Sequence, residues 1–423
     1  MSSTNLPQEL VDVIVHNLCE DISSLRSCSL AARAFVVSAQ IHIFKRIEIM
    51  PPTDPSSSSN SCQKLYKLLT LSPHLAQLVD ELRIVLVGPE TSFEYDSDGQ
   101  YLEDRHVTWI MRERRTLALV LPLLDLKRIS LVEDSPLDWN SYGEFSMKWN
   151  ELGRHLKAAL SKAFSSPRLE SVQLRGIVLE SPRQLLALFS DATALTELSL
   201  SRVYYTQRWD QRDPWPESQP WHPRLQSLLA SDISGDPICR QLISPRIDLT
   251  CITSLTIATE ANDSRETIIR AANSTVEHLK LRYISGKVLR SLKEFCSNLP
   301  SGAGDFKSII GPNLRSLHLL TTTFHSMDAL FKSCPHDARL ESVVFEGPLS
   351  GTCAPSVNAT VDAALVHFRF LKKVEVRRYL FYDSEPFSTW SAEILASLPS
   401  LVQRSILAPT EVSVEDKVHH GWE

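Results

Sequence analysis

One short pattern of apolar and polar positions recurs along the chain: an apolar residue, two others, an apolar residue, one other and a further apolar residue. It occurs ten times, and successive copies begin 24 to 47 residues apart, mostly 24 to 31. The ten triplets are Val79/Leu82/Ile84, Leu126/Ile129/Leu131, Leu169/Val172/Leu174, Leu195/Leu198/Leu200, Leu225/Leu228/Ala230, Ile252/Leu255/Ile257, Val276/Leu279/Leu281, Leu314/Leu317/Leu319, Leu340/Val343/Phe345 and Leu371/Val374/Val376. Side chains two positions apart on a strand point to the same face. The last two apolar residues of each triplet therefore predict a short strand with one buried face.

Helical periodicity occupies many of the intervals between these expected strands. The expected helices are Asn150 to Phe164, Pro182 to Ser190, Ser264 to Ala272, Lys287 to Cys296 and Val361 to Phe370. Strand, helix and strand at this interval predict right-handed crossover units whose strands form a parallel sheet. Each unit leaves apolar surface open until a neighbour covers it, so ten in succession predict an α/β solenoid. An ordinary doubly wound α/β domain is the alternative.

The triplets resemble the L-x-x-L-x-L strands of leucine-rich repeats over roughly residues 79 to 400. That family usually places Asn or Cys three residues after the last apolar strand position, and this chain departs from the rule. The residues at that position are Val87, Asp134, Ile177, Val203, Ile233, Glu260, Ile284, Thr322, Pro348 and Tyr379. The resemblance therefore implies an irregular leucine-rich-repeat solenoid with insertions over residues 64–402, followed by a tail over residues 403–423.

The first fifty residues have a different pattern, with apolar residues at helical spacing and almost no Gly or Pro. Pro7 suits the first turn of a helix, and Asp21 or Ser23 suits the cap of a second one. The apolar face of the first helix is expected to hold Leu10, Val13, Ile14 and Leu18. We expect three helices in residues 1–50. A linker is expected over residues 51–63, because the run PPTDPSSSSNS offers nothing to bury.

The segments LPQELVDVIVHNL, DISSLRSCSLAARAF and QIHIFKRIEI resemble an F-box. The residues that match in order are Leu6, Pro7, Glu9, Leu10, Ile14, Leu18, Leu25, Cys28 and Phe44. The usual tryptophan of the third helix is absent, so Phe35 or Phe44 would take its role. The resemblance implies that this segment docks a SKP-family linker protein, which connects it to a cullin-based ubiquitin ligase. The docking residues so implied are Leu6, Pro7, Leu10, Ile14, Leu18, Leu25 and Leu30. The alternative is that the three helices only cap the open end of the first repeat.

Composition narrows the range of partners. With 43% hydrophobic and 22% charged residues the chain can bury a large core, and its net charge of −6 gives no basic footprint for nucleic acid. We find no secretory pattern at the N-terminus and no run near the ~20 apolar residues that a membrane helix needs. The eight cysteines form no C-x-x-C, and no Cys/His group has zinc-ligand spacing. We therefore expect a cytoplasmic or nuclear protein without membrane or nucleic-acid partners, and without a metal or other cofactor.

Motifs for bond chemistry are missing from the sequence: it holds no H-E-x-x-H, no G-x-S-x-G and no Walker-type loop. We expect a substrate-recognition adaptor of a ubiquitin ligase, not an enzyme, with a client protein bound by the repeat sheet. The candidate client-facing residues are Arg83, Gln173, Arg175, Lys280, Arg282, His318, Glu375 and Arg377. The alternatives are a repeat-based interaction scaffold unconnected with ubiquitin and, more remotely, an α/β enzyme. The Trp-rich insertion from Tyr204 to Trp221 is either a binding loop or a lid over the repeats.

Overall fold

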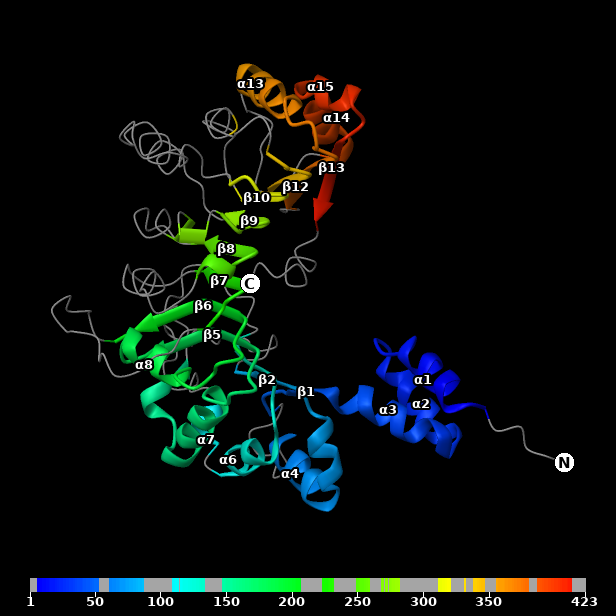
Figure 1. Cartoon of the computed structure of the whole chain (residues 1–423), viewed down its shortest axis with the longest axis vertical. Coiled ribbons are helices and arrows are strands. Elements are labelled where there is room, and N and C mark those ends of the chain that lie inside the picture. Colours follow the sequence, from blue (N-terminus) through cyan, green and yellow to red (C-terminus); the bar gives the residue numbers. More distant parts are fainter. Residues whose placement is uncertain are drawn as a thin grey trace, which may run out of the picture. The chain divides into compact units, whose positions relative to one another are not determined.

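The computed structural model describes residues 6–52, 61–86, 109–113, 115–133, 147–206, 223–231, 249–258, 268–269, 271–272, 274–281, 311–320, 331, 338–346, 355–379 and 386–412. In these residues the fold is mixed α/β, and parallel strands alternate with helices along the chain (Figure 1). This arrangement is compatible with the predicted solenoid. The chain divides into two compact units, Met1–Leu195 with Val203–Pro223, and Thr196–Arg202 with Arg224–Glu423.

The N-terminal segment forms three helices, as predicted. They are α1 (Gln8–His16), α2 (Ile22–Ala31) and α3 (Arg33–Lys45), and strand β1 (Arg46–Ile49) follows α3 directly. Pro7 is the N-cap residue of α1, and Asp21 caps α2 by accepting hydrogen bonds from the backbone N–H groups of Ser23 and Ser24 at 3.0 and 3.1 Å. The core between the helices consists of Val11, Val15, Leu25 and Ala39, with Leu18, Phe35 and Ile43 packed against it.

The first unit continues with a parallel sheet in the order β1-β2-β3-β5, and the short β4 pairs with β5. Its strands after β1 are β2 (Glu81–Val85), β3 (Arg128–Val132), β4 (Met147–Lys148) and β5 (Ser171–Leu179). Its remaining α-helices are α4 (Ser61–Leu71), α5 (Trp109–Arg112), α6 (Thr116–Val120), α7 (Arg154–Phe164) and α8 (Pro182–Leu188). In succession α4, α6, α7 and α8 pack against one another, so helices and strands form two layers.

The second unit repeats this arrangement. Its strands, β6 to β13, pair with their neighbours in chain order and are all parallel. They are β6 (Glu197–Tyr205, whose last residues belong to the first unit), β7 (Ser227–Ser231), β8 (Ser254–Ala258), β9 (His278–Leu281), β10 (Ser316–Leu320), β11 (Ser342–Glu346), β12 (Lys373–Tyr379) and β13 (Leu407–Val412). The described helices are α13 (Pro355–Val366), α14 (Phe387–Ser397) and α15 (Pro399–Gln403). The expected helix Lys287 to Cys296 lies outside the described residues.

The apolar triplets supply core residues in both units. All thirty of their residues are buried, and a strand occurs at each of the ten predicted positions. The strands are in register, so that Leu82 lies beside Ile129 in the first unit and Val343 beside Val374 in the second. The prediction of parallel strands from the triplets is therefore confirmed.

Strand β5 continues past the strand that its triplet predicts. Within it, the alternation of buried and outward side chains shifts by one residue, so the buried positions are even-numbered in the first half and odd-numbered in the second. Val172 and Leu174 are buried in the first half, and Ile177 and Leu179 in the second. Between them Gly176 has a φ of 70°, a left-handed conformation that glycine adopts without the steric penalty of a side chain. This bend lets an apolar residue face the core at the position where leucine-rich repeats usually have Asn or Cys.

Strand β6 bends at the corresponding place. Leu198 and Leu200 are buried before the bend and Val203 after it, and Arg202 between them has a φ of 52°. Arg202 follows the start of β6 by five residues, as Gly176 follows the start of β5. Both nine-residue strands therefore continue past the position at which leucine-rich repeats usually turn.

Two boundaries differ from those expected from the sequence. Helix α4 begins at Ser61, inside the expected linker, because Cys62, Leu65 and Leu69 give its first turns an apolar side to bury. Strand β13 lies in the expected tail and pairs in parallel with β12, so the sheet continues past residue 402. Among the described helices, none has the length and apolar character needed to cross a membrane.

Candidate functional site

Helix α1 carries two apolar stripes, and the fold buries only one of them. Val11 and Val15 are fully buried in the core, whereas Leu10, Val13 and Ile14 are 51%, 57% and 42% exposed. Residues one position apart are rotated by about 100° around a helix, so the two stripes lie on different sides. We call Leu10, Val13 and Ile14 the α1 apolar face.

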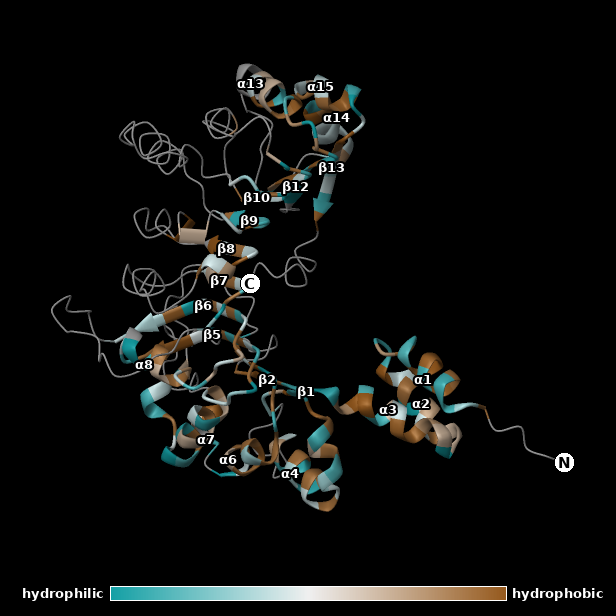
Figure 2. Ribbon diagram, viewed as in Figure 1, coloured by the Kyte–Doolittle hydropathy of each residue, from teal (hydrophilic) through white to brown (hydrophobic). Residues whose placement is uncertain are grey.

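Other apolar side chains of the same helical segment are also exposed. They are Leu6, Ile22, Leu30, Val37 and Ile41. Figure 2 shows hydrophobic colouring along α1 and α3. Contiguous exposed apolar surface on a small domain marks an interaction site more often than a solvated face.

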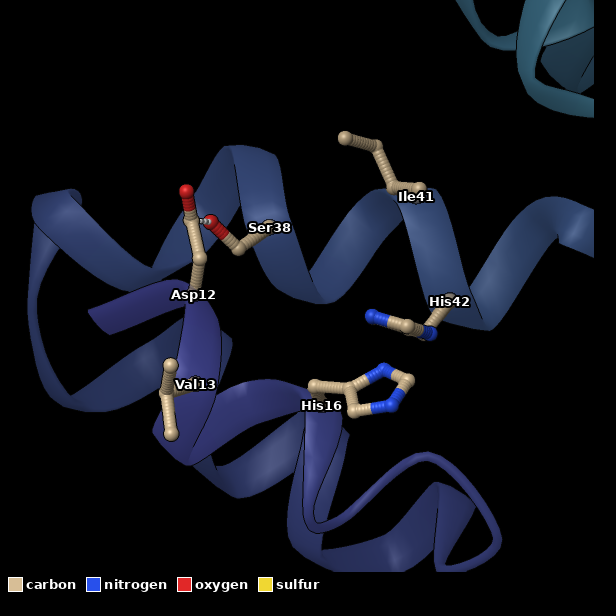
Figure 3. A pocket seen from close by; sticks show the side chains of 6 residues that line it. All are labelled: Asp12, Val13, His16, Ser38, Ile41 and His42. Atoms are coloured by element: carbon tan, nitrogen blue, oxygen red, sulfur yellow. Dashed lines mark hydrogen bonds between the residues drawn. The ribbon is translucent and has the colours of Figure 1, made fainter. Parts of the chain in front are cut away.

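A groove of about 420 Å³ lies between α1 and α3, lined by Asp12, Val13, His16, Ser38, Ile41 and His42. At one end the Ser38 hydroxyl donates to the Asp12 carboxylate (Figure 3). Gln8 Nε2 donates to Asp12 Oδ1 at 2.9 Å and to Ser38 Oγ at 3.1 Å. The hydrogen bond from Ser38, followed by that from Gln8, lowers the pKa of Asp12. This polar clamp joins α1 to α3 and fixes the groove between them.

Two histidines form the other end of the groove. The ring centroids of His16 and His42 lie 5.6 Å apart, with their planes tilted by 52° (Figure 3). Burial lowers the pKa of His42, and the nearby His16 and Lys45 lower it further. The groove thus has an acidic end, an apolar rim and an imidazole end.

The residues implied for docking a linker protein divide into two groups. Leu6, Pro7, Leu10, Ile14 and Leu30 are exposed, and Leu10 and Ile14 lie one turn apart on α1. The other two lie in the helix packing: Leu25 is fully buried in the core, and the partly buried Leu18 packs against it. Leu25 was expected to contact the partner, but it supports α2 from inside, because its turn of the helix faces α3.

In the first unit, candidate client residues lie on a row that crosses the sheet. The register places Glu48, Arg83, Ser130 and Gln173 side by side on β1, β2, β3 and β5. Arg83 Nε lies 2.9 Å from Glu48 Oε1. Arg83 and Gln173 are thus brought onto one face, whereas Arg175, two residues further along β5, is buried.

In the second unit the register brings four of the candidate residues together. Lys280 lies beside His318, and Val344 lies between His318 and Glu375. Two residues further along the strands, Glu346 lies beside Arg377. We call Lys280, His318, Glu346, Lys373, Glu375 and Arg377 the charged cluster. Arg282 lies outside the described residues, so its position relative to this cluster stays a prediction.

Hydrogen bonds and ion pairs connect the charged cluster. His318 Nε2 lies 2.6 Å from Glu346 Oε2, and Arg377 Nε donates to Glu375 Oε1 at 2.6 Å. Lys373 Nζ lies 2.8 Å from Glu375 Oε2, and an Arg377 terminal nitrogen lies 4.0 Å from Glu346 Oε2. Burial alone would raise the pKa of Glu375, but the hydrogen bonds from Arg377 and Lys373 outweigh it and lower the pKa to about 2.

The charged cluster lies on the face of the sheet opposite the helices. The ring of Phe345 is 6.1 Å from that of Phe331, which lies 6.2 Å from Phe368 just after α13. Phe345 therefore points towards the helical side, and its neighbour Glu346 points the other way. Sequence reasoning missed Glu346, although it directly follows the last apolar residue of its triplet, as Arg377 does in the next one.

Burial also perturbs His318 in this cluster. Loss of hydration lowers its pKa, the hydrogen bond to Glu346 works in the opposite direction, and Lys280 and Arg377 lower the pKa further. The part of the chain that the structure describes contains no group of three or more His, Cys, Asp or Glu side chains placed to hold a metal ion.

Comparisons with known proteins leave these surfaces to be interpreted from their chemistry. No protein-family model matches the sequence, and no curated protein matches it.

Proposed function

We propose that the chain is a substrate-recognition adaptor of a cullin-based ubiquitin ligase, in which the N-terminal helices act as an F-box and dock a SKP-family linker protein. The observation that carries the proposal is the α1 apolar face: Leu10, Val13 and Ile14 are exposed on a helix whose other apolar stripe is buried. Leaving three large aliphatic side chains half exposed forfeits about 1 kcal/mol or more of burial for each. A partner that covers them recovers this free energy, so the surface suits an apolar protein partner.

In this proposal the remainder of the chain is an irregular leucine-rich-repeat domain that holds a client protein. The support is the register of the strands, which turns widely separated outward-facing residues into continuous rows. Repeat sheets present such rows as extended binding surfaces. Ubiquitin transfer would be performed by other subunits, and this chain would contribute proximity between client and ligase.

Capture of a purified SKP-family linker protein by the immobilised full chain tests the proposal. The variant Leu6→Ala/Pro7→Ala/Leu10→Asp places a charge in the α1 apolar face, and capture should fall at least tenfold, since a buried unpaired carboxylate costs well over ~1.4 kcal/mol. Leu119→Asp is the matched control, because Leu119 on α6 has almost the same exposure as Leu10, 50% against 51%. Both variants should keep the wild-type circular dichroism spectrum.

One observation favours a second candidate, a repeat-based interaction scaffold whose N-terminal helices only cap the sheet. Helix α3 ends at Lys45 and β1 begins at Arg46, so the helices lead without a linker into the first strand. The same experiment separates the two candidates. If the wild-type chain captures no linker protein, or if Leu119→Asp loses capture as fully as the Leu10 variant, the ubiquitin role is refuted and the scaffold stands.

A further inference from the structure

The groove between α1 and α3 contains a carboxylate whose charge is not neutralised by any of the described residues. Ser38 and Gln8 both donate to Asp12 Oδ1, and both are neutral groups. Among the described residues, no Lys or Arg pairs with Asp12, and no group donates to its Oδ2. The two hydrogen bonds lower the pKa of Asp12, so the exposed side chain is ionised at neutral pH. This end of the groove therefore presents a full negative charge.

The charges of the two helices do not offset this carboxylate. The other acid of α1, Glu9, lies three residues before Asp12, a spacing that makes the two side chains neighbours on the helix surface. The Lys and Arg residues of α3 are at its two ends, with Arg33 five residues before Ser38 and Lys45 seven residues after it. At 1.5 Å per residue these distances are about 7.5 and 10.5 Å along the helix axis, where solvent screening is strong.

The dimensions of the groove suit a long basic side chain. Its acidic and imidazole ends lie about one helical turn apart, because Asp12 and His16 are four residues apart on α1, as are Ser38 and His42 on α3 (Figure 3). Between the ends, Val13 and Ile41 supply an apolar rim. Lys and Arg side chains combine an aliphatic stem, which packs on apolar surface, with a cation at the tip.

The groove is continuous with the α1 apolar face, because Val13 belongs to both. A partner that covers Leu10, Val13 and Ile14 therefore reaches the rim of the groove and removes water from Asp12. Taking a carboxylate out of water without a counter-charge is strongly unfavourable. A partner that docks tightly on this face must then supply a cation at Asp12.

We propose that the linker protein that docks on the α1 apolar face inserts a Lys or Arg side chain into the groove between α1 and α3, where its cation pairs with Asp12. Val13 and Ile41 contact the aliphatic stem. Ser38 and Gln8 are positioning residues, which orient the carboxylate through Oδ1 and leave Oδ2 to the incoming cation. The inference rests on the proposed function and names the chemistry that the linker protein must present.

Binding of a purified SKP-family linker protein to the immobilised full chain, measured by surface plasmon resonance, tests this inference. Asp12→Asn keeps the oxygen that accepts from Ser38 and Gln8 and removes only the charge, and it should raise the Kd at least tenfold. Glu20→Gln is the matched control: it removes the same charge from an exposed acid of the same helical segment that does not line the groove. Its Kd should stay within twofold of the wild-type value.

The sign of the effect distinguishes a paired carboxylate from one that is merely covered. If the linker protein supplied no cation, docking would desolvate Asp12 without compensation, and Asp12→Asn would bind as tightly as the wild type or more tightly. A Kd for Asp12→Asn equal to or below the wild-type Kd therefore overturns the inference.

A double-mutant cycle identifies the partner of Asp12 and separates pairing from a loss of folding. Each exposed Lys and Arg of the linker protein is replaced by Gln in turn, and binding is measured to the wild-type chain and to Asp12→Asn. One replacement should weaken binding to the wild-type chain at least fivefold more than binding to Asp12→Asn. If no basic residue of the linker protein shows this coupling, the inference is overturned even where Asp12→Asn alone binds weakly.

The same measurements keep this inference apart from the proposed function. If Asp12→Asn captures the linker protein as well as the wild type does, only the inference fails. If the wild-type chain captures no linker protein, both fail. Sedimentation velocity of the chain without linker protein tests the other occupant: a dimer that Asp12→Asn dissociates would assign the groove to a second copy and overturn the inference.

Discussion

Replacing Asp362 by Ala should loosen the end of the second unit. Asp362 is 3% exposed on α13, and its two carboxylate oxygens accept the backbone N–H groups of Ser400 at 2.9 Å and Leu401 at 3.0 Å. These N–H groups belong to the first turn of α15, where a helix has no internal partners for them. Asp362 therefore caps a helix that lies almost forty residues further along the chain.

The magnitude follows from the two hydrogen bonds. Each charge-assisted bond contributes about 1.5–3 kcal/mol, and part of this is offset because the variant no longer desolvates a carboxylate. We expect Asp362→Ala to destabilise the α15 region by about 2–3 kcal/mol, and Asp362→Asn, which keeps one acceptor oxygen, by about half as much. The loss should extend to Arg404, whose guanidinium donates to the carbonyl oxygens of Val366 and Leu371 at 3.1 and 3.2 Å.

Hydrogen exchange followed by mass spectrometry on the full chain measures this local effect directly. Amides of residues 399–412 should exchange about 30- to 150-fold faster in Asp362→Ala than in the wild type. Glu393→Ala is the control, because Glu393 is an exposed acid on the neighbouring α14 and should change exchange very little. Exchange in Asp362→Ala within threefold of the Glu393→Ala rate would refute the assignment of Asp362 as the cap.

Three further predictions concern backbone strain, pH and thiol reactivity. Gly176→Ala should destabilise the first unit by at least ~2 kcal/mol, because a Cβ there would overlap the buried Glu133 side chain and the positive φ adds strain. Thermal melts measure this loss, and an unchanged melting temperature would contradict it. Because the pKa of Glu375 is lowered to about 2, its contribution is complete above pH ~4.5 and is lost as pH falls towards 2. Screening by solvent at its half-exposed partner reduces the unscreened ~3 kcal/mol to about 1–2 kcal/mol, and urea unfolding of Glu375→Gln should show a correspondingly weaker pH dependence between pH 5 and 3. Burial raises the pKa of Cys62 to about 12, so mass spectrometry after native-state alkylation at pH 8 should find Cys62 unmodified and Cys19 modified; equal modification of both would show that Cys62 is accessible.

The strands could be predicted from the sequence because each triplet combines two independent requirements. Its last two positions must share a face, and its first must close the turn that leads into the strand, so a chance match at ten successive places is rare. The phase change in β5 and β6 could not be predicted in the same way. Glycine adopts a left-handed conformation readily, so Gly176 is compatible with the bend in β5. Arginine does not favour this conformation, and at Arg202 only packing against neighbouring residues stabilises it.

The N-terminal surface was predictable only in part, because α1 has apolar residues on both sides. Leu10 and Ile14 are four residues apart, and so are Val11 and Val15, so helical spacing alone does not tell which pair faces the core. The contacts with α3 decide it, and they bury the second pair. Leu25 shows the same ambiguity. The F-box resemblance placed it among the docking residues, but it lies in the core.

The charged cluster depends on both the buried and the outward-facing positions of the strands. Its members come from β9, β10, β11 and β12, and no local pattern connects Lys280 with Arg377, which are almost a hundred residues apart. The apolar triplets set the register, and the register then places the outward residues of successive strands side by side. The segments between strands can differ in length without altering this alignment, because the buried positions alone fix it. Substitutions at the outward positions would therefore change the surface that the sheet presents while leaving the core untouched. We expect the strongest changes at the position directly after each triplet, which Glu346 and Arg377 occupy in adjacent strands.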